Sequence, residues 1–335
     1  MVTQLSEPPD RPSRASRRLS LIVPVLNEES NIPTLYQALR PELERLGADW
    51  ELIFVDDGST DGSAAAVLKL HGGDPRVKLL SLSRNFGHQS ALTAGMDHAS
   101  GDAVIMMDAD LQHPPSLIGA LVEHWEQGYE VVYTVRELTE DAGRWKRLTA
   151  SLFYRIFRSL SGVDLPANAA DFRLLDRKVI EAFRHIRERT RFLRGLTSWV
   201  GYRSAAVSYR AGSRVSGRSK YGIRRMLGFG IDGLVSFSAT PLYLSIYLGM
   251  MLALAGGVYF VYVLYARLIV GDTVPGWTSL IILVMLIGGV QLSLMGIIGV
   301  YVGRVYEEAK QRPLYLVDRS VGLEKASPPP DKTLR

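Results

Sequence analysis

The chain has no cysteine, and this absence removes several kinds of chemistry at once. Disulfides, thiolate metal sites and a cysteine nucleophile are excluded, while the redox compartment stays undetermined. The N-terminal stretch 1–18 also lacks a long apolar run, because it is polar and rich in proline and arginine. A secretory signal needs such a run. We therefore expect residues 1–18 to be a disordered basic segment and the following domain to stay in the cytoplasm.

Two other stretches, 242–266 and 277–303, lack charged residues altogether. Each is longer than the about 20 apolar residues that a helix needs to cross a bilayer. A buried core helix is the alternative, but such helices seldom stay uncharged on every face over this length. Residues 267–276 contain a Pro-Gly turn and predict a hairpin. We expect 229–303 to hold a juxtamembrane helix and two transmembrane helices, followed by a C-terminal tail over 304–335.

The net charge of +5 is modest, so the positions of the basic residues matter more than their number. They precede the first apolar stretch and follow the second: Arg210, Arg214, Arg218, Lys220, Arg224, Arg225; Arg304, Lys310, Arg312, Arg319. The positive-inside rule then places both termini in the cytoplasm and the protein in the inner membrane as a multi-pass protein. The sequence contains no interleaving of basic and aromatic residues, so we expect no nucleic-acid partner. Glycines in both spans invite helix packing and favour a homo-oligomer.

A helix with one apolar face is predicted near 144–162. Its apolar positions share a face opposite a row of arginines: Trp145, Leu148, Leu152, Phe153, Ile156, Leu160; Arg144, Arg147, Arg155, Arg158. Such a helix can lie in the membrane interface with its guanidinium groups toward lipid phosphates. Packing against the soluble domain would require the same apolar stripe, so both interpretations stay open.

Residues 19–228 read as one α/β domain. Five β-rich apolar runs alternate with amphipathic segments: 19–25, 51–57, 77–83, 103–110 and 130–136. This alternation predicts a mostly parallel sheet with helices on both faces. In such sheets ligands bind beyond the carboxyl ends of the strands.

The predicted strand ends carry polar residues: Pro24, Asn27, Glu28; Asp56, Asp57; Arg84, His88; Asp108, Asp110. If these strand ends had only a structural role, carboxylates would not gather there, because like charges repel. No G-x-G-x-x-G follows the first strand and no G-x-x-x-x-G-K-[ST] occurs anywhere. Nicotinamide-dependent and P-loop chemistry therefore lose their main support.

Asp108 and Asp110 lie two residues apart, so on an extended segment both side chains point the same way. Two carboxylates, completed by substrate phosphates and water, are a usual setting for Mg²⁺. A solvated acidic turn is the alternative.

Four motifs stand in a fixed order at these strand ends: VPVLNEE (23–29), VDDGSTDGS (55–63), SRNFGHQSALTAGMDHASGD (83–102) and DADLQHPP (108–115). Together they resemble the inverting family 2 glycosyltransferases of GT-A fold, a Rossmann-like, mostly parallel α/β fold. Later segments are similar to polyprenyl-phosphate glycosyltransferases, particularly bacterial bactoprenol glucosyltransferases and dolichyl-phosphate mannose synthases: ADFRLLDRKV (170–179), RTRFLRGLTSWVGYR (189–203), GRSKYG (217–222) and GRVYEEAKQRPLY (303–315). Only the termini fall outside the resemblance.

The resemblance implies transfer of one sugar, with inversion, from a nucleotide-sugar to a polyprenyl phosphate such as undecaprenyl phosphate. It leans to UDP-glucose or another UDP-hexose, without fixing the sugar. Pro24, Glu28 and Asp56 would hold the uracil and ribose, with Asp57 and Arg84 close by and Arg84 on the diphosphate. Glu28 taken alone could instead be a carboxylate favoured by a helix dipole. Leu26 stands where many members carry an aromatic residue, so the resemblance does not imply stacking on the base.

By the same resemblance Asp108, Asp110 and Gln112 would bind Mg²⁺ or Mn²⁺. Gln112 matches a position that completes the metal shell in relatives. Asp171 matches an aspartate near the reacting groups, as a base or as an orienting group.

The acceptor accounts for the remaining basic residues. A lipid phosphate is already an anion, so it needs alignment with the sugar carbon more than a strong base. The candidates for this alignment are Arg136, Arg147, Arg214 and Lys220; each alone could be a solvated or positive-inside charge. We expect Asp110, Asp171 and Arg136 to be catalytic.

Two rival functions remain. A processive polysaccharide synthase would carry a Q-x-x-R-W motif and more spans; residues 194–199 offer no such match. A non-catalytic membrane scaffold or transporter subunit would have no reason to keep Asp56, Asp108 and Asp110 beside a basic acceptor loop.

Overall fold

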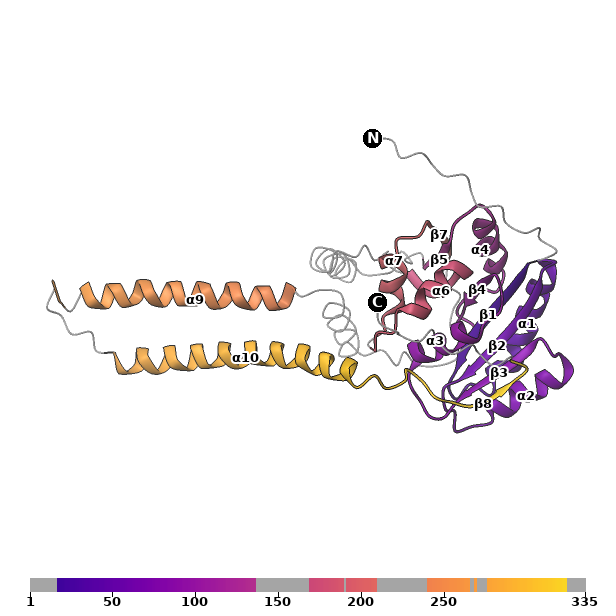
Figure 1. Cartoon of the computed structure of the whole chain (residues 1–335), viewed down its shortest axis with the longest axis horizontal. Coiled ribbons are helices and arrows are strands. Elements are labelled where there is room, and N and C mark those ends of the chain that lie inside the picture. The colour runs from indigo at the N-terminus through magenta and orange to yellow at the C-terminus, as the bar shows by residue number, and fades with distance from the viewer. Residues whose placement is uncertain are drawn as a thin grey trace, which may run out of the picture. The chain divides into compact units, whose positions relative to one another are not determined.

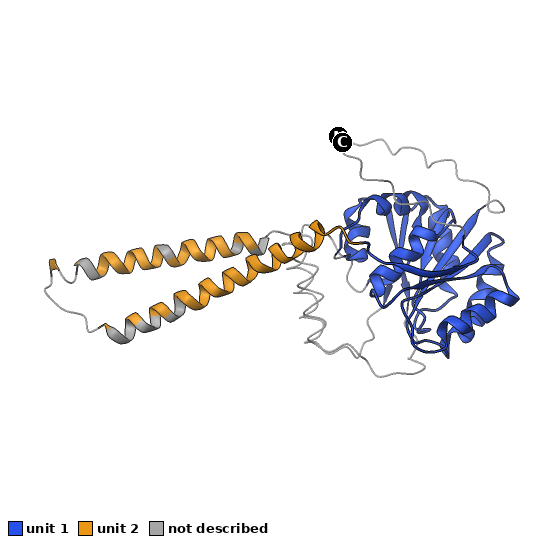
Figure 2. Cartoon of the chain, turned by 60° about the horizontal axis from the view of Figure 1, so that its bottom comes forward, with its two compact units in different colours: residues 1–158, 163–223, 313–335 blue, residues 159–162, 224–312 orange. Residues whose placement is uncertain are grey.

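A computed structural model describes residues 17–136, 169–189, 191–209, 240–265, 268–269 and 276–323. The chain divides into two compact units (Figure 2). Unit 1 comprises residues 1–158, 163–223 and 313–335, and unit 2 comprises residues 159–162 and 224–312. The predicted interfacial helix near 144–162 lies outside the described residues.

Unit 1 is built around one eight-stranded sheet of order β7-β5-β6-β4-β1-β2-β3-β8 (Figure 1). Its elements are β1 (Arg18–Val25), α1 (Asn31–Arg45), β2 (Asp49–Asp56), α2 (Ser63–Gly73), β3 (Val77–Leu82), α3 (His88–His98), β4 (Ala103–Met106), α4 (Leu117–Glu126), β5 (Val131–Arg136), β6 (Ala169–Asp176), α6 (Arg177–His185), α7 (Leu193–Trp199), β7 (Ser204–Tyr209) and β8 (Val317–Val321). Only β6 and β8 run antiparallel to the strands they pair with. The predicted mostly parallel α/β fold is confirmed.

Helices cover both faces of this sheet. The helix α1 buries Ile32, Leu35, Leu39 and Leu43, whose spacing of three or four residues places them on one helix face. This face joins α2, α4 and alternate residues of β1 in one apolar core. The helices α3 and α6 pack on the other side of the sheet. The strands between are apolar on both faces, as the continuous runs in the sequence predict.

The strand β6 was not among the predicted strands. It adds residues to the edge of the sheet where the parallel strands end, which we call the rim. It lies between β4 and β5 and pairs with β4 in antiparallel register, with Met106 opposite Arg173. The amino end of β6, which carries Asp171, therefore lies at the edge where the parallel strands end. Its sequence ADFRLLD contains three charged residues, and the buried arginine among them hides the apolar run that signals a central strand.

The segment after the second long helix contains another unpredicted strand. The strand β8 lies at the sheet edge beside β3 (Figure 1). Just before it, the Tyr315 hydroxyl donates to Asp97 Oδ2 at 2.8 Å. The stretch 304–335, expected to be a tail, thus contributes an edge strand to the α/β unit. At the other terminus β1 already begins at Arg18, whose backbone N–H donates to Asp102 at 2.9 Å.

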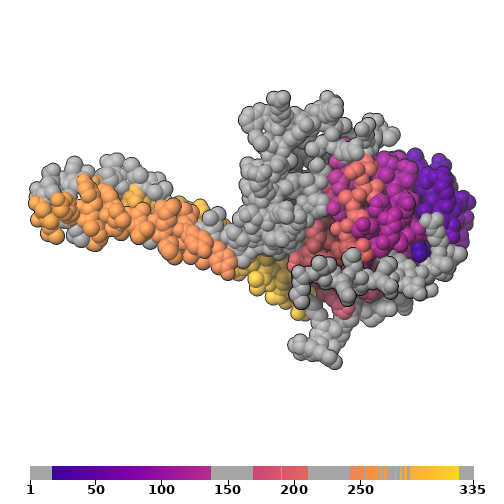
Figure 3. Space-filling model, turned by 90° about the horizontal axis from the view of Figure 1, so that it is seen from above, coloured from indigo at the N-terminus to yellow at the C-terminus, as the bar shows by residue number. Residues whose placement is uncertain are grey.

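Unit 2 contains two long helices, α9 (Thr240–Tyr265) and α10 (Trp277–Ala309). By length and composition both are able to cross a membrane. They match the two predicted spans, although α10 continues six residues past Gly303. The described side chains of α9 form part of the surface of this unit in Figure 3, where they are orange.

A buried polar cluster links the strands β1, β2 and β3 near their amino ends. The Glu51 carboxylate, 1% exposed, accepts hydrogen bonds from Lys78 Nζ at 2.6 Å, Ser20 Oγ at 2.5 Å and the Ser100 backbone N–H at 2.8 Å. Burial works against the charged form, but these donors outweigh it and leave the pKa of Glu51 below its ordinary value. The cluster is therefore a fully paired charge in the core.

We expect the Glu51→Ala variant to lower the free energy of unfolding of unit 1 by about 3–5 kcal/mol, because Lys78 would be left buried and unpaired. For a domain of this size that is a fall in Tm of roughly 6–20 °C, measurable by circular dichroism in detergent. The control is Asp49→Ala, two residues earlier on the same strand with a side chain 66% exposed. A loss of stability as small as that of the control would contradict the role of the cluster.

Candidate active site

The candidate site lies at the edge of the sheet where β1, β2 and β4 end and β6 begins. Three side chains meet there: Asp108 just after β4, Asp171 on β6 and His88 at the start of α3. The Nε2 atom of His88 lies 3.5 Å from Asp108 Oδ1 and 3.9 Å from Asp171 Oδ2. The imidazole thus faces both carboxylates, and two negative charges occupy one small region.

Asp108 has a histidine on each side. His88 faces its Oδ1, and His113, from the loop before α4, has its Nδ1 3.9 Å from Asp108 Oδ2. Burial raises the pKa of Asp108 above its ordinary value. The charges of Asp171 and Asp110 act in the same direction, and the two histidines oppose them. Asp108 is therefore a carboxylate whose charged form would be favoured by a cation.

Asp171 is held in a different way, by two arginines. Arg194 donates from Nε and Nη2 to the two carboxylate oxygens at 2.7 and 2.8 Å. Behind it Arg173, 3% exposed, lies 3.6 Å from Asp171 Oδ1. Burial acts to raise the pKa of Asp171, but Arg194 outweighs it, so the pKa lies well below its ordinary value. Asp171 is a fixed anion.

The backbone around Asp108 and Asp110, the expected metal ligands, is not the extended segment that we predicted. β4 ends at Met106, and Asp110 lies in a turn, so the two aspartates do not share an extended segment. Asp110 is exposed and its Oδ1 accepts the Gln112 backbone N–H at 3.1 Å. Gln112 is half-buried beside it.

The described residues contain no group of three or more His, Asp or Glu side chains that could alone hold a metal ion. Two carboxylates and an amide still suit a hard divalent cation that shares its shell with phosphate and water. The raised pKa of Asp108, caused by burial and then by nearby negative charge, fits such a cation.

The loop after β2 packs tightly against the loop after β3. Asp57 accepts the backbone N–H groups of Phe86 at 2.7 Å and Gly87 at 2.9 Å. Burial raises the pKa of Asp57, against the effect of these donors. At Gly58, where φ is 75°, an added Cβ would lie 2.5 Å from the carbonyl carbon of Arg84. Glycine is therefore required there, and Asp57 holds the two loops in register.

The other predicted donor residues lie on β1, β2 and the loops that follow them. Pro24 is buried and pairs with Val55 in the sheet register. Asp56 is buried and accepts the Ser59 N–H at 2.9 Å. Glu28 precedes α1, and its carboxylate accepts from Asn31 Nδ2 at 2.5 Å.

Arg84 is exposed and stacks on Phe86, with its guanidinium carbon 4.1 Å from the ring centroid. It also donates to the Asn85 carbonyl at 3.0 Å. The Arg84 guanidinium therefore lies at the surface of the loop that Asp57 holds in place.

Arg136 is the predicted acceptor residue that the structure describes. It is exposed at the end of β5 and lies opposite Tyr209 in the parallel pairing with β7. Burial raises the pKa of Tyr209, and the charges of Arg136, Asp108, Asp110 and Arg194 all act on it. Arg136 lies at the same edge of the sheet as Asp171, because the end of β5 pairs with the start of β6 at Val135 and Ala169. Arg147, Arg214 and Lys220 lie outside the described residues.

Sequence reasoning did not assign a role to four residues at this rim: His88, His113, Arg173 and Arg194. The histidines lie inside two of the quoted motifs, so their position there was an available signal. Arg173 and Arg194 could be placed only once β6 and α7 were known to lie beside β4.

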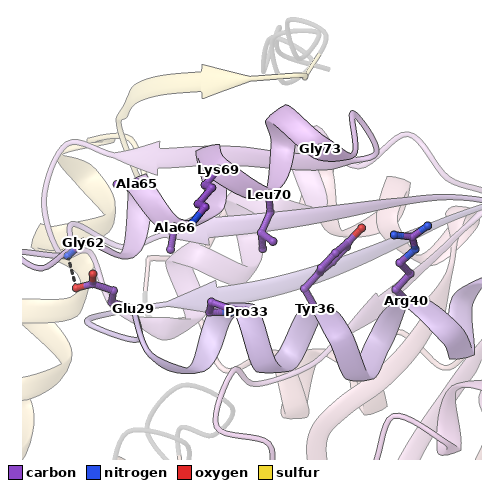
Figure 4. Close-up of a pocket in the computed structure, with 10 residues that line it drawn as sticks. All are labelled: Glu29, Pro33, Tyr36, Arg40, Gly62, Ala65, Ala66, Lys69, Leu70 and Gly73. Atoms are coloured by element: carbon purple, nitrogen blue, oxygen red, sulfur yellow. Dashed lines mark hydrogen bonds between the residues drawn. The ribbon is translucent and has the colours of Figure 1, made fainter.

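A cavity of about 600 Å³ lies elsewhere, between α1 and α2 (Figure 4). Pro33, Tyr36 and Arg40 line it from α1, and Lys69 and Leu70 from α2. None of the predicted site residues lines this cavity.

Comparison with known proteins identifies the family to which this fold, with its acidic rim, belongs. The family model described as glycosyl transferase family 2 matches residues 20–184. This range begins within β1 and includes β2 to β6, and therefore Asp108, Asp110 and Asp171. The chain belongs to the family 2 glycosyltransferases, as the resemblance in its motifs predicted.

Relatives extend the similarity over most of the chain. An uncharacterized glycosyltransferase YkcC of Bacillus subtilis (strain 168) is 45% identical, with 91% of this chain and 94% of the relative covered. The bactoprenol glucosyl transferase of Shigella phage SfII is 39% identical, with 90% and 98% covered. A solved glucosyl-3-phosphoglycerate synthase from Mycobacterium tuberculosis is 19% identical with a TM-score of 0.46, covering 68% of this chain and 84% of that chain.

Proposed function

We propose that this glycosyltransferase moves one sugar from a UDP-hexose, with UDP-glucose the favoured donor, to a polyprenyl phosphate at the cytoplasmic face of a membrane. The observation that carries the proposal is the rim where Asp108, His88 and Asp171 meet beside Arg194, with Arg136 where β5 ends at the same edge of the sheet. This arrangement puts carboxylates for a metal-bound diphosphate next to cations for a phosphate acceptor. Similarity to bactoprenol glucosyl transferases over 90% of the chain supports the acceptor class.

The donor half of the site comprises the loops after β1, β2 and β3. Pro24, Glu28 and Asp56 would hold uracil and ribose, since a carboxylate can accept the base N3–H. Asp57 fixes the loop that presents Arg84 to the diphosphate. When bound, Mg²⁺ or Mn²⁺ held by Asp108, Asp110 and Gln112 would neutralise charge on the nucleoside diphosphate leaving group.

The reaction is a direct displacement with inversion. An oxygen of the lipid phosphate forms a bond to the anomeric carbon, while the bond from that carbon to the diphosphate oxygen breaks and UDP leaves. Arg136 would hold the acceptor phosphate, together with Arg147, Arg214 and Lys220. Alignment by these cations replaces a strong base, because the attacking oxygen is already ionised.

Asp171 fits an orienting role better than that of a base. Its pKa is held low, despite burial, by the bidentate pair with Arg194, and a base of low pKa accepts protons poorly. We therefore propose that Asp171 fixes Arg194 at the acceptor side of the rim.

Unit 2 supports membrane attachment. The side chains of Leu254 and Leu292 are 72% and 71% exposed on α9 and α10, in helices without charge over their central stretches. Exposed apolar surface of this extent favours lipid over water. The inner membrane and a cytoplasmic position for both termini follow from the basic residues that flank the spans.

The test is a transfer assay on the full chain in detergent with Mg²⁺ or Mn²⁺, undecaprenyl phosphate and a panel of radiolabelled nucleotide-sugars. Label from a UDP-hexose moving into the organic phase is the expected result, and the active donor names the sugar. Absence of label from every donor, with folded protein, would contradict the proposal and favour the non-catalytic scaffold. A product with many sugars per lipid would favour the polysaccharide synthase.

A further inference from the structure

His113 carries a buried nitrogen that the described part of unit 1 leaves without a hydrogen bond. The residue is 6% exposed, and its Nδ1 has no partner. That atom faces Asp108, with Oδ2 at 3.9 Å, about 1 Å beyond the usual N–H···O distance. Buried polar atoms are nearly always paired, so an orphan of this kind calls for an explanation.

The imidazole is held in place by rings on two different strands. It stacks on Phe172 of β6, with ring centroids 5.3 Å apart and planes 28° apart. Its other neighbour is Tyr209 of β7, edge-on at 6.1 Å. Phe172 precedes Arg173 and follows Asp171, and Tyr209 lies opposite Arg136, so His113 packs beneath both halves of the site.

The backbone of the loop returns His113 to Asp108. Leu111 has φ of 58°, a left-handed conformation that a leucine side chain disfavours. Strain of this kind persists where the surrounding structure imposes it, and it clusters at functional sites. The turn places residue 113 below residue 108 with Nδ1 aimed at the carboxylate.

We propose that His113 is a positioning residue that sets the orientation of the Asp108 carboxylate through a hydrogen bond from Nδ1 to Oδ2, completed when the metal-bound nucleotide is held. The inference rests on the proposed function only in taking Asp108 as a ligand of the metal-bound nucleotide. His113 itself touches neither substrate nor metal. The hydrogen bond requires the imidazole tautomer that carries its proton on Nδ1.

The test compares two variants that separate the ring from the nitrogen. His113→Phe keeps an aromatic ring against Phe172 and Tyr209 but removes Nδ1. His113→Asn loses the ring but keeps an amide nitrogen near the position of Nδ1. The readout is the affinity for UDP with and without Mn²⁺, measured by calorimetry on the full chain in detergent, with no transfer required.

We expect His113→Phe to weaken Mn²⁺-dependent UDP binding by about 10–100-fold, the usual effect of losing a partner that orients a metal ligand. Binding of UDP without metal should stay within about threefold of wild type, and His113→Asn should recover most of the Mn²⁺-dependent affinity. His124→Phe is the matched control, because His124 lies on α4 and its Nδ1 bonds the Ala120 carbonyl one turn earlier on the same helix.

A second comparison shows whether His113 acts through Asp108. In the Asp108→Asn background, His113→Phe should cause no further loss of Mn²⁺-dependent binding beyond about twofold. A further loss of tenfold, or wild-type binding by His113→Phe alone, would overturn the inference. If His113→Phe does not fold, His113→Gln takes its place, because its longer side chain places the amide away from Nδ1, and binding equal to His113→Asn would overturn the inference.

The two proposals fail separately. Wild-type protein that binds UDP with Mn²⁺ but transfers no sugar would contradict the proposed function and leave the role of His113 intact. If the wild type transfers sugar and His113→Phe binds UDP with Mn²⁺ as the wild type does, the role of His113 is contradicted and the proposed function stands.

Discussion

Sugar transfer by the Asp110→Ala variant is expected to fall by about 100–1,000-fold or more, while the protein stays folded and membrane-bound. Asp110 is exposed, and its hydrogen bond to the Gln112 N–H is local, so its loss should change stability by only about 0.5 kcal/mol. Its carboxylate is one of two proposed to hold the cation that neutralises the leaving diphosphate, an effect that acts mainly in the transition state. The measurement is label moved from nucleotide-sugar into the organic phase, with Tm recorded in parallel.

The matched control removes an aspartate at the opposite end of the same sheet. Asp49 opens β2 and is 66% exposed, so Asp49→Ala should transfer sugar at the wild-type rate. Chelation of divalent cations in the wild type should reproduce the loss, and Mn²⁺ or Mg²⁺ should reverse it. Full transfer both by Asp110→Ala and after chelation would rule out the metal role.

Five of the six parallel strands, β1 to β5, could be predicted from sequence because each was an almost continuous apolar run. The sixth, β7, pairs with β5 in parallel register and was not among the predicted strands. The predicted runs at 19–25, 51–57 and 77–83 correspond to β1, β2 and β3 within one or two residues at each end. Burial on both faces of a parallel sheet produces this signal, and helices with apolar faces separate the runs. The α/β class followed directly.

The antiparallel strands could not be predicted in the same way. The strand β6 places the buried Arg173 in its centre, where the guanidinium donates to Thr197 Oγ1 at 2.5 Å and to the Ala170 carbonyl at 2.9 Å. The bond to Thr197 of α7 is a tertiary contact, so the sequence around Arg173 gives no signal that this charge can be buried in a strand. The strand β8 is exposed along almost its whole length and lacks alternation, so its pairing with β3 is a tertiary event.

The same limit applies to the candidate site. Asp108 and Asp110 could be found because they follow a predicted strand directly and carry a recognisable spacing. The neighbour of Asp108, His88, comes from α3, and Arg194, which pairs with Asp171, comes from α7. The antiparallel insertion of β6 brings Asp171 to the same edge of the sheet. Side chains contributed by strand ends are predictable from topology, whereas those contributed through an unforeseen strand are not.

The Asp171→Asn variant is expected to lose about 100-fold in kcat while the KM for the nucleotide-sugar stays within about threefold. The substitution removes the charge that holds Arg194 through two hydrogen bonds, so the acceptor side of the rim loses its fixed geometry. Arg194→Ala should have a similar effect. The double variant should be no worse than the poorer single variant by more than about threefold, because the pair acts as one unit.

The pH dependence separates an orienting role from that of a base. The folded pKa of Asp171 lies below its ordinary value, although burial alone would raise it, because Arg194 favours the charged form. A depressed carboxyl pKa means that Asp171 stays ionised at every pH above about 4, and that the pair loses its contribution to stability only as pH falls below that. The plots of kcat against pH for wild type and Asp171→Asn should therefore have the same shape between about pH 5.5 and 8.5.

Asp97→Asn supplies the control for a merely structural effect. Asp97 accepts two hydrogen bonds from Arg187, at 2.7 and 3.1 Å, and its side chain is 11% exposed against 15% for Asp171. Arg187 is more buried than Arg194, and Asp97 lies at the far end of α3 from His88. The control should lower Tm as Asp171→Asn does but keep kcat within about threefold of wild type. If the wild type shows an acid limb that disappears in Asp171→Asn, then Asp171 accepts a proton during transfer and the orienting role is wrong. If the control loses as much kcat as Asp171→Asn, the effect reflects the stability of α3 and not the geometry of the rim.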